Sequence, residues 1–306
     1  MNTVFYDCAV NDDIRRQRLF DGQIFVFSPR PASLALIEFA RGMITQAFGS
    51  RDPLTAQYGM PVEEYVSVVA PLKPAFIHHP ETMKLLRAVV EAVGCDLEAT
   101  YVDVPRLRMV TSDAYLTSGV GYAHHLHRDT WYSAPMAQLN WWIPIYDFES
   151  ESSMAFHPRY WAEAVENGSA EFNYYEWNAV GRKQAAQHVK ADTRRQPKAK
   201  QEMELEPQVR VVCPAGGIIL FSAAQMHSTV PNTSGRTRYS LDFRTVNMQD
   251  LLSANGAPNV DSAPTGTSLR DFVRARDFAA IPEEVVRQYD IGPRVDGELV
   301  FNPNAS

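Results

Sequence analysis

Two histidines and one aspartate have the residue types and spacing of a metal site. His127 and Asp129 are separated by one residue, so both side chains would point to one face of a strand. This pair alone is weak evidence, because eight histidines and 36 acidic residues among 306 positions produce about one such pair by chance. A further histidine, His227, follows a Gly-Gly turn and the apolar segment 218–221. Two imidazoles and one carboxylate leave adjacent metal positions open, as in iron(II) sites that activate oxygen.

The strand predicted after His227 adds a second feature. From Arg236 to Arg244, alternate positions are polar or charged, including three arginines, while the positions between them are largely apolar. A half-exposed antiparallel strand alternates in the same way, so the pattern alone does not require a binding site. Arg238 could nevertheless bind a carboxylate through two parallel hydrogen bonds, and Ser240 could donate a further one. These residues predict a site for a dianionic cosubstrate.

Together, these motifs resemble the phytanoyl-CoA dioxygenase-like branch of the iron(II)/2-oxoglutarate oxygenases. The matching pieces are the N-terminal run RLFDGQIFVF, the triplet at 127–129 and the segment at 216–238. The resemblance implies a double-stranded β-helix, or jelly roll, in which the two histidines and the aspartate bind Fe(II). Arg238 would then bind the distal carboxylate of 2-oxoglutarate. The segment at 149–161 departs from the family pattern, so the resemblance does not supply the substrate.

The reaction implied by the resemblance consumes O2 and 2-oxoglutarate and releases succinate and carbon dioxide. Hydroxylation is the default outcome, while desaturation, ring closure and epimerisation stay open. Relatives that halogenate replace the metal-binding carboxylate with a small residue, so the presence of Asp129 argues against halogenation.

Four further residues are candidates for substrate contact. Arg108 precedes the metal motif and is either a buried, paired arginine or an anchor for a substrate carboxylate. Asn140 and Trp142 share one face of a predicted strand, and Tyr122 could form a wall of the pocket. Tryptophans in such strands more often belong to the core. From the arginine-rich face we expect a small polar metabolite, such as an amino-acid derivative or a specialised-metabolism intermediate.

The elements that must position these residues are mainly strands, with helices outside them. The pattern predicts a short helix, a turn and a strand within 14–27, and helices at 33–48 and 80–93. Short segments rich in β-branched and aromatic residues predict strands at 101–110, 122–132, 138–146, 209–213, 216–222 and 236–246.

We expect one oxygenase domain over residues 1–306. It would comprise an N-terminal strand and helices (14–100), a jelly-roll core (101–246) and a helical tail (247–306). An insertion at 160–207 is in part strongly charged; a solvated helix and loop is favoured there over a mobile lid. The tail could serve as a homodimer surface or as a cover for the site.

Composition limits the partners. The formal net charge of −7 argues against a nucleic-acid-binding protein and against an acidic membrane surface. Three cysteines without a paired motif fit a reducing compartment. No run reaches the roughly 18 apolar residues needed to span a bilayer, and the N-terminus lacks an apolar signal region. We therefore expect a cytoplasmic protein that acts on a small molecule.

Two other functions stay open at this point. A cupin-type metalloenzyme could use the same three metal ligands without 2-oxoglutarate, which would leave Arg238 without a cosubstrate. A non-catalytic binding protein could have kept the barrel and lost turnover, although three intact ligands and Arg238 argue against it.

Overall fold

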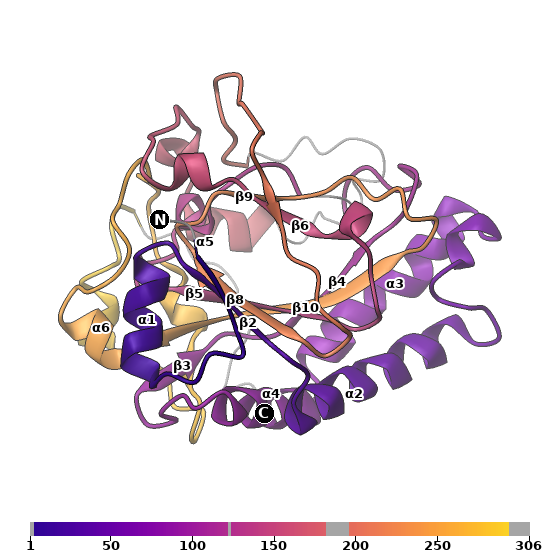
Figure 1. Ribbon diagram of the computed structural model, residues 1–306, viewed down its shortest axis with the longest axis horizontal. Coiled ribbons are helices and arrows are strands. Elements are labelled where there is room, and N and C mark those ends of the chain that lie inside the picture. Colours follow the sequence, from indigo (N-terminus) through magenta and orange to yellow (C-terminus); the bar gives the residue numbers. More distant parts are fainter. Residues whose placement is uncertain (1–2, 122–123, 182–195, 294–306) are drawn as a thin grey trace.

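The core of the molecule is a large mixed sheet faced by a small one (Figure 1). The computed structural model describes residues 3–121, 124–181 and 196–293. In order, the large sheet contains β1 (Val4–Tyr6), β2 (Ile24–Phe27), β8 (Ile218–Ser222), β5 (Leu139–Pro144), β10 (Arg238–Asn247), β3 (Thr100–Val102) and β11 (Val273–Arg274), and β4 (Arg106–Val110) also pairs with β10. The small sheet contains β7 (Val209–Arg210), β6 (Met154–Phe156) and β9 (His227–Thr229). This is the predicted mainly-β fold, a double-stranded β-helix with flanking helices.

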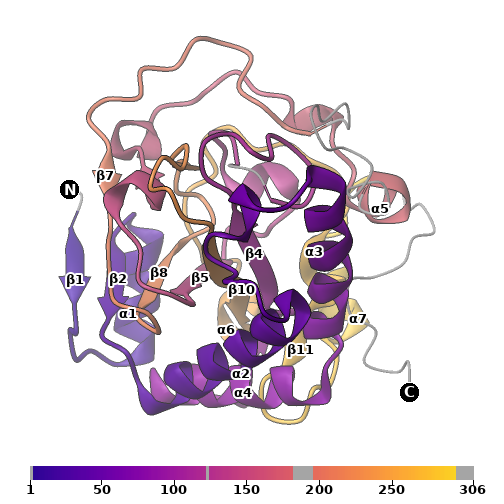
Figure 2. The same ribbon diagram turned by 90° about the vertical axis from the view of Figure 1, so that its right-hand side faces the viewer.

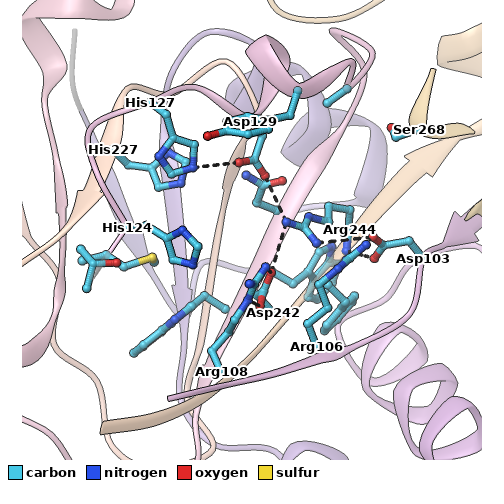
Figure 3. Close-up of a pocket in the computed structure, with 18 of the residues that line it drawn as sticks. Asp103, Arg106, Arg108, His124, His127, Asp129, His227, Asp242, Arg244 and Ser268 are labelled. Carbon is cyan, nitrogen blue, oxygen red and sulfur yellow. Dashed lines mark hydrogen bonds and ion pairs between the residues drawn. The ribbon is translucent and has the colours of Figure 1, made fainter. Parts of the chain in front are cut away.

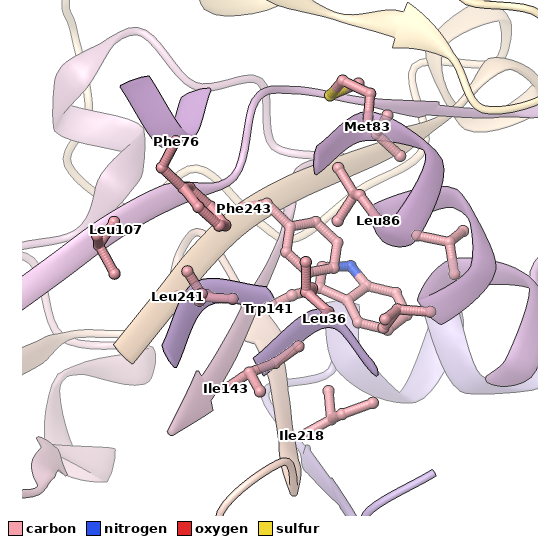
Figure 4. Close-up of a cluster of buried hydrophobic side chains, with 14 of the residues drawn as sticks. Leu36, Phe76, Met83, Leu86, Leu107, Trp141, Ile143, Ile218, Leu241 and Phe243 are labelled. Carbon is pink, nitrogen blue, oxygen red and sulfur yellow. The ribbon is translucent and has the colours of Figure 1, made fainter. Parts of the chain in front are cut away.

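Helices cover the outer face of the large sheet (Figure 2). The helices are α1 (Asp12–Phe20), α2 (Pro31–Phe48), α3 (Val62–Ile77), α4 (Pro80–Ala92), α5 (Tyr174–Glu176), α6 (Met248–Leu252) and α7 (Glu283–Val286). Figure 4 shows Leu36 of α2 and Leu86 of α4 against the sheet, close to Trp141 and Phe243, whose rings stack with centroids 5.1 Å apart. Because side chains alternate along a strand, the neighbours of Phe243 on β10 point away from the helices.

Most of the predicted N-terminal elements are present. The helix, turn and strand within 14–27 are α1 and β2, and α4 begins at Pro80 as expected. Helix α2 begins at Pro31, so Ser33 lies inside its first turn, where its Oγ accepts a hydrogen bond from the Arg30 N–H at 2.9 Å. The helix predicted at 33–48 therefore begins two residues earlier than expected, because Pro31 already begins it.

Helix α3 was not predicted from the sequence. It contains two internal prolines, Pro71 and Pro74, and proline normally interrupts a helix because it lacks an N–H donor. The buried residues Tyr65, Val69 and Leu72 hold one side of α3 against the core. Tertiary packing thus outweighs the local signal here.

In the described residues 124–132, the predicted strand is not formed. Residues 122–123 lie outside the described part of the chain, and His127 makes only an isolated antiparallel bridge with His227, with both N···O distances at 3.0 Å. Asp129 already begins a short 3-10 helix, Asp129–Tyr132. The intervening Arg128 is buried and donates to the Ala224 carbonyl at 2.7 Å, which holds the chain in this turn.

The described part of the C-terminal segment, residues 247–293, carries less helix than expected. Its described part contains the short helices α6 and α7, and it adds the strand β11 to the edge of the large sheet, next to β3. In the inserted segment at 160–207, residues 182–195 lie outside the described part, so the lid question stays open. Among the described residues, no helix has the length and apolar character needed to cross a membrane.

Candidate metal centre and active site

His127, Asp129 and His227 come together between the two sheets. One ligand atom from each lies within 4.8 Å of the others, and His127 Nε2 is 3.3 Å from Asp129 Oδ1. The Nδ1 atoms of the two histidines lie 2.7 and 3.0 Å from the carbonyls of His125 and Gln225. Because a carbonyl only accepts, each Nδ1 is the donor, which leaves Nε2 as the atom that each histidine can present to a metal.

The electrostatic setting suits a metal ion. Burial and, to a lesser extent, neighbouring His127 lower the pKa of His227 to about 4, so this imidazole is neutral at physiological pH. Burial alone would raise the pKa of Asp129, but the hydrogen bond with His127 and the charge of Arg244 hold it well below its usual range. Two imidazoles and one carboxylate are a donor set that fits Fe(II). In the described part of the chain, this is the one such cluster of three groups.

A cavity of about 430 Å³ opens at the triad (Figure 3). Its wall includes three of the four predicted substrate residues, Arg108, Asn140 and Trp142. The fourth, Tyr122, lies outside the described residues. Asn140 Oδ1 accepts a hydrogen bond from Gln138 at 3.0 Å, so this amide is already oriented.

Arg238 lies in the cavity wall with no carboxylate partner among the described residues. Its guanidinium is buried, donates from Nη1 to the Ser152 carbonyl at 2.8 Å and lies 5.4 Å above the Trp142 ring. Its Nε has no hydrogen-bond partner, and neither does the buried hydroxyl of Ser240, two positions along β10. Burial lowers the pKa of Arg238 to about 10. A buried cation with unsatisfied donors fits the distal carboxylate of 2-oxoglutarate.

Arg236 does not share this position. The sequence placed it on the same face as Arg238 and Arg244, but it precedes the first residue of β10 and is exposed. The strand alternation holds only where the chain is hydrogen-bonded to β4 and β5.

A row of alternating charges runs from the metal site along the large sheet. Arg244 Nη2 lies 3.6 Å from Asp129 Oδ2 and 3.2 Å from Asp242 Oδ2, and its Nη1 lies 3.5 Å from Asp103 Oδ2. Asp242 also accepts from Arg108 Nε at 2.6 Å. Burial opposes ionisation, yet these neighbours raise the pKa of Arg244 and lower that of Asp242.

Arg106 completes the row, because its Nη1 lies 2.5 Å from the same Asp103. The alternation of polar and apolar residues along β10 also marked Asp242 and Arg244, although the sequence analysis used it only to predict an arginine-rich face. Asp103 had no such signal, because its partner Arg244 lies on β10, far along the chain.

Aromatic side chains form another part of the wall. Tyr132 packs edge-on against His127 with centroids 5.6 Å apart, Phe172 follows Tyr132 at 5.2 Å, and Trp177 follows Phe172 at 6.0 Å. All three line the cavity, and two of them belong to the inserted segment. The run FNYYEW at 172–177 was the available sequence signal.

Two more histidines are resolved by the structure. His124 lines the cavity. His157 is buried, with Nδ1 3.1 Å from the Leu205 carbonyl and Nε2 3.0 Å from Ser228 Oγ.

The jelly roll and its His-Asp-His cluster define a mononuclear metal centre of the non-haem type. The family model described as phytanoyl-CoA dioxygenase (PhyH) matches residues 46–240, and the chain belongs to this family. The protein is therefore an iron(II)- and 2-oxoglutarate-dependent oxygenase, with O2 as its other substrate. No curated protein matches the chain significantly.

Several solved structures match the chain at 14% identity. EvdO2 from Micromonospora carbonacea var. aurantiaca, complexed with 2-oxoglutarate, has a TM-score of 0.43 over 78% of this chain and 92% of its own. The epimerase SnoN, in complex with Fe3+, alpha ketoglutarate and nogalamycin RO, has 0.38 over 77% and 85%. The carbocyclase SnoK from nogalamycin biosynthesis has 0.39 over 83% and 93%.

Proposed function

We propose that this oxygenase hydroxylates a small polar metabolite at a metal held by His127, Asp129 and His227. The observation that carries the cosubstrate assignment is the buried Arg238, whose Nε is unsatisfied in the wall of the same cavity as the triad. A buried guanidinium without an anion is costly, and the distal carboxylate of 2-oxoglutarate would satisfy it.

The residues have separable roles in this proposal. When bound, Fe(II) and 2-oxoglutarate supply the oxidising power, with release of succinate and carbon dioxide. His127 and His227 present Nε2 to the metal, because their Nδ1 atoms are fixed on backbone carbonyls. Arg238 and Ser240 hold the cosubstrate, and Trp142 supports the guanidinium from below. Trp142 thus acts at the cosubstrate end of the cavity, while Asn140 and Arg108 are proposed to contact the substrate.

The first test is an anaerobic titration with Fe(II) and 2-oxoglutarate, monitored by the visible charge-transfer band of the chelated metal. We expect the band in the wild type and its loss in His127→Ala and Arg238→Ala. Arg236→Ala is the matched control, because it removes an exposed arginine two positions from Arg238. Succinate release with candidate substrates, followed by a product mass increased by one oxygen, then tests hydroxylation.

The outcomes separate the parts of the proposal. If iron binds and no band forms, the 2-oxoglutarate site is wrong and a different metalloenzyme activity is indicated. If iron does not bind, the three proposed ligands are wrong. A product without the added oxygen would replace hydroxylation with desaturation, ring closure or epimerisation.

A further inference from the structure

The turn that carries His127 and Asp129 is held by the residue between them. The Arg128 side chain is 2% exposed, and its guanidinium donates from Nη1 to the Ala224 carbonyl at 2.7 Å and from Nη2 to two carbonyls of the inserted segment. Ala224 lies three residues before the third metal-site residue, His227. The bond from Arg128 to Ala224 therefore joins the two segments that bring the triad together.

Asp261 provides the carboxylate for this buried guanidinium. Its side chain is 4% exposed, and Arg128 Nε lies 3.1 and 3.2 Å from its two oxygens. The same carboxylate accepts from Trp131 Nε1 at 2.8 Å and from the Val165 N–H at 3.0 Å. One carboxylate thus contacts the metal-site turn at positions 128 and 131 and also holds the inserted segment.

The next residue, Ser262, adds a further contact between the same two segments. Its Oγ donates to Thr130 Oγ1 at 2.7 Å. Asp129 is therefore flanked on both sides in the chain by residues that are bonded to segment 261–262. This segment lies beyond residue 240, where the match to the family model ends, so the family assignment does not supply its role.

These contacts bear on metal binding in two ways. Groups that orient metal ligands in advance increase affinity, because the ligands need not be ordered when the metal binds. Without Asp261, Arg128 would be a buried cation with no carboxylate, one residue from each of two ligands, and it would repel a bound cation. Both effects have the same sign: loss of Asp261 should weaken metal binding.

We propose that Asp261 is a positioning residue of the metal centre, which acts through Arg128 and Trp131 on the turn that presents His127 and Asp129. The inference rests on the proposed function, because it takes the triad as the iron ligands. Among the described residues, Asp261 belongs neither to the metal cluster nor to the cavity wall, so its effect is transmitted by the turn.

The test is the Fe(II) affinity of Asp261→Asn, measured anaerobically by competition with a chromogenic chelator. Asparagine keeps the size of the side chain and removes its charge. We expect the dissociation constant for Fe(II) to rise by at least about tenfold, the lower end of the range for outer partners of metal ligands. The visible spectrum of Co(II) bound in place of Fe(II) gives a second readout. It should differ from that of the wild type, because the spectrum depends on the arrangement of the ligands.

Asp250→Asn is the matched control. Asp250 is also a buried carboxylate paired with an arginine, Arg16, and its side chain is 6% exposed. It is not among the described residues that line the cavity. The variant should be less stable than the wild type in urea, yet it should keep the wild-type Fe(II) affinity and Co(II) spectrum.

A charge-balanced variant keeps the test decisive if Asp261→Asn does not fold. Arg128→Met/Asp261→Asn removes both partners and leaves no unpaired charge, so a change in affinity then reports the lost contacts alone. We expect the same loss of at least about tenfold in Fe(II) affinity. Arg16→Met/Asp250→Asn is its control and should bind Fe(II) as the wild type does.

Two results would overturn the inference while the proposed function stands: wild-type Fe(II) affinity with an unchanged Co(II) spectrum in the Asp261 variants, or an equal loss of affinity in the Asp250 controls. If the wild type itself binds no iron, the three proposed ligands are wrong and the inference falls with them. If the wild type binds iron but forms no charge-transfer band with 2-oxoglutarate, only the cosubstrate assignment fails. The comparison of Fe(II) affinities then still decides the role of Asp261.

Discussion

Two buried arginines near the metal site differ in how well they are satisfied. Arg128, between His127 and Asp129, is buried and donates to the Ala224 carbonyl, to other backbone carbonyls and to the carboxylate of Asp261. Arg238 is buried as well, yet within the described part of the chain its Nε has no hydrogen-bond partner and its guanidinium forms no ion pair with a carboxylate. Because buried polar groups are nearly always paired, Arg128 has a structural role, whereas the unpaired donor of Arg238 indicates a residue that binds a ligand.

Ser240→Ala tests this distinction at a single hydroxyl. The Oγ of Ser240 is buried without a partner, so its removal should not lower the stability of the ligand-free protein. The same change should weaken 2-oxoglutarate binding by about tenfold, the effect of one lost hydrogen bond to a charged group. The dissociation constant from the charge-transfer titration and the midpoint of urea unfolding measure both effects.

Ser153→Ala is the control for that prediction, because the Ser153 hydroxyl donates to the Ser150 carbonyl at 3.0 Å. It should lower stability without changing 2-oxoglutarate affinity. An unchanged affinity in Ser240→Ala would remove Ser240 from the cosubstrate site.

Strand β10 is the element that joins the core to the site. Its residues Tyr239, Leu241 and Phe243 are buried in the main core, while Arg238 and Asp242 face the cavity. Helices α2, α3 and α4 cover the core side, as Figure 4 shows for the cluster around Trp141. The position of the charged row therefore depends on apolar packing behind it.

Leu36→Ala tests the packing of α2 on this sheet. Leu36 is fully buried in the main core, so its truncation should lower the free energy of unfolding by about 3 kcal/mol, through lost burial and a cavity. Leu34, on the same helix, is 45% exposed, and Leu34→Ala should cost less than about 0.5 kcal/mol. Urea unfolding of both variants measures the difference. Equal losses would show that α2 does not pack as described.

At the scale of the molecule, an ion pair joins α1, near the start of the chain, to α6, which directly follows β10. Arg16 of α1 forms an ion pair with Asp250 of α6, with Nε 2.6 Å from Oδ2 and the two side chains 9% and 6% exposed. Burial opposes the charge, but Asp12 and Asp250 raise the pKa of Arg16. The pair connects the helix that precedes β2 to the segment that follows β10.

Arg16→Met should therefore destabilise the whole molecule. Removal of one partner leaves Asp250 buried without its cation, which costs about 3 kcal/mol of unfolding free energy. Arg159→Met removes a similar but exposed pair with Glu163 and should cost less than about 0.5 kcal/mol. Urea unfolding midpoints give the comparison; a loss as small as that of Arg159→Met would contradict a structural role for the tie.

Much of the fold and of the candidate site could be predicted from local patterns. The spacing of His127 and Asp129 and the strand before His227 indicated a metal site, and the alternation after it selected Arg238 and Ser240. These predictions succeed because ligand type and strand period are local properties of the chain. The expected strand around Asp129 was wrong, because contacts of Arg128 with distant backbone hold this segment in a turn.

By itself, the sequence determined which groups can bind a metal and a cosubstrate. These are two imidazoles, one carboxylate, and an arginine on the polar face of a later strand. Only the tertiary structure decided what surrounds that chemistry. The charged row forms because the register of β4 against β10 brings Arg108 to Asp242, and the aromatic part of the wall forms because an inserted segment places Phe172 against Tyr132. Such contacts join residues far apart in the chain, so strand register and packing decide them, and neither is visible in local spacing.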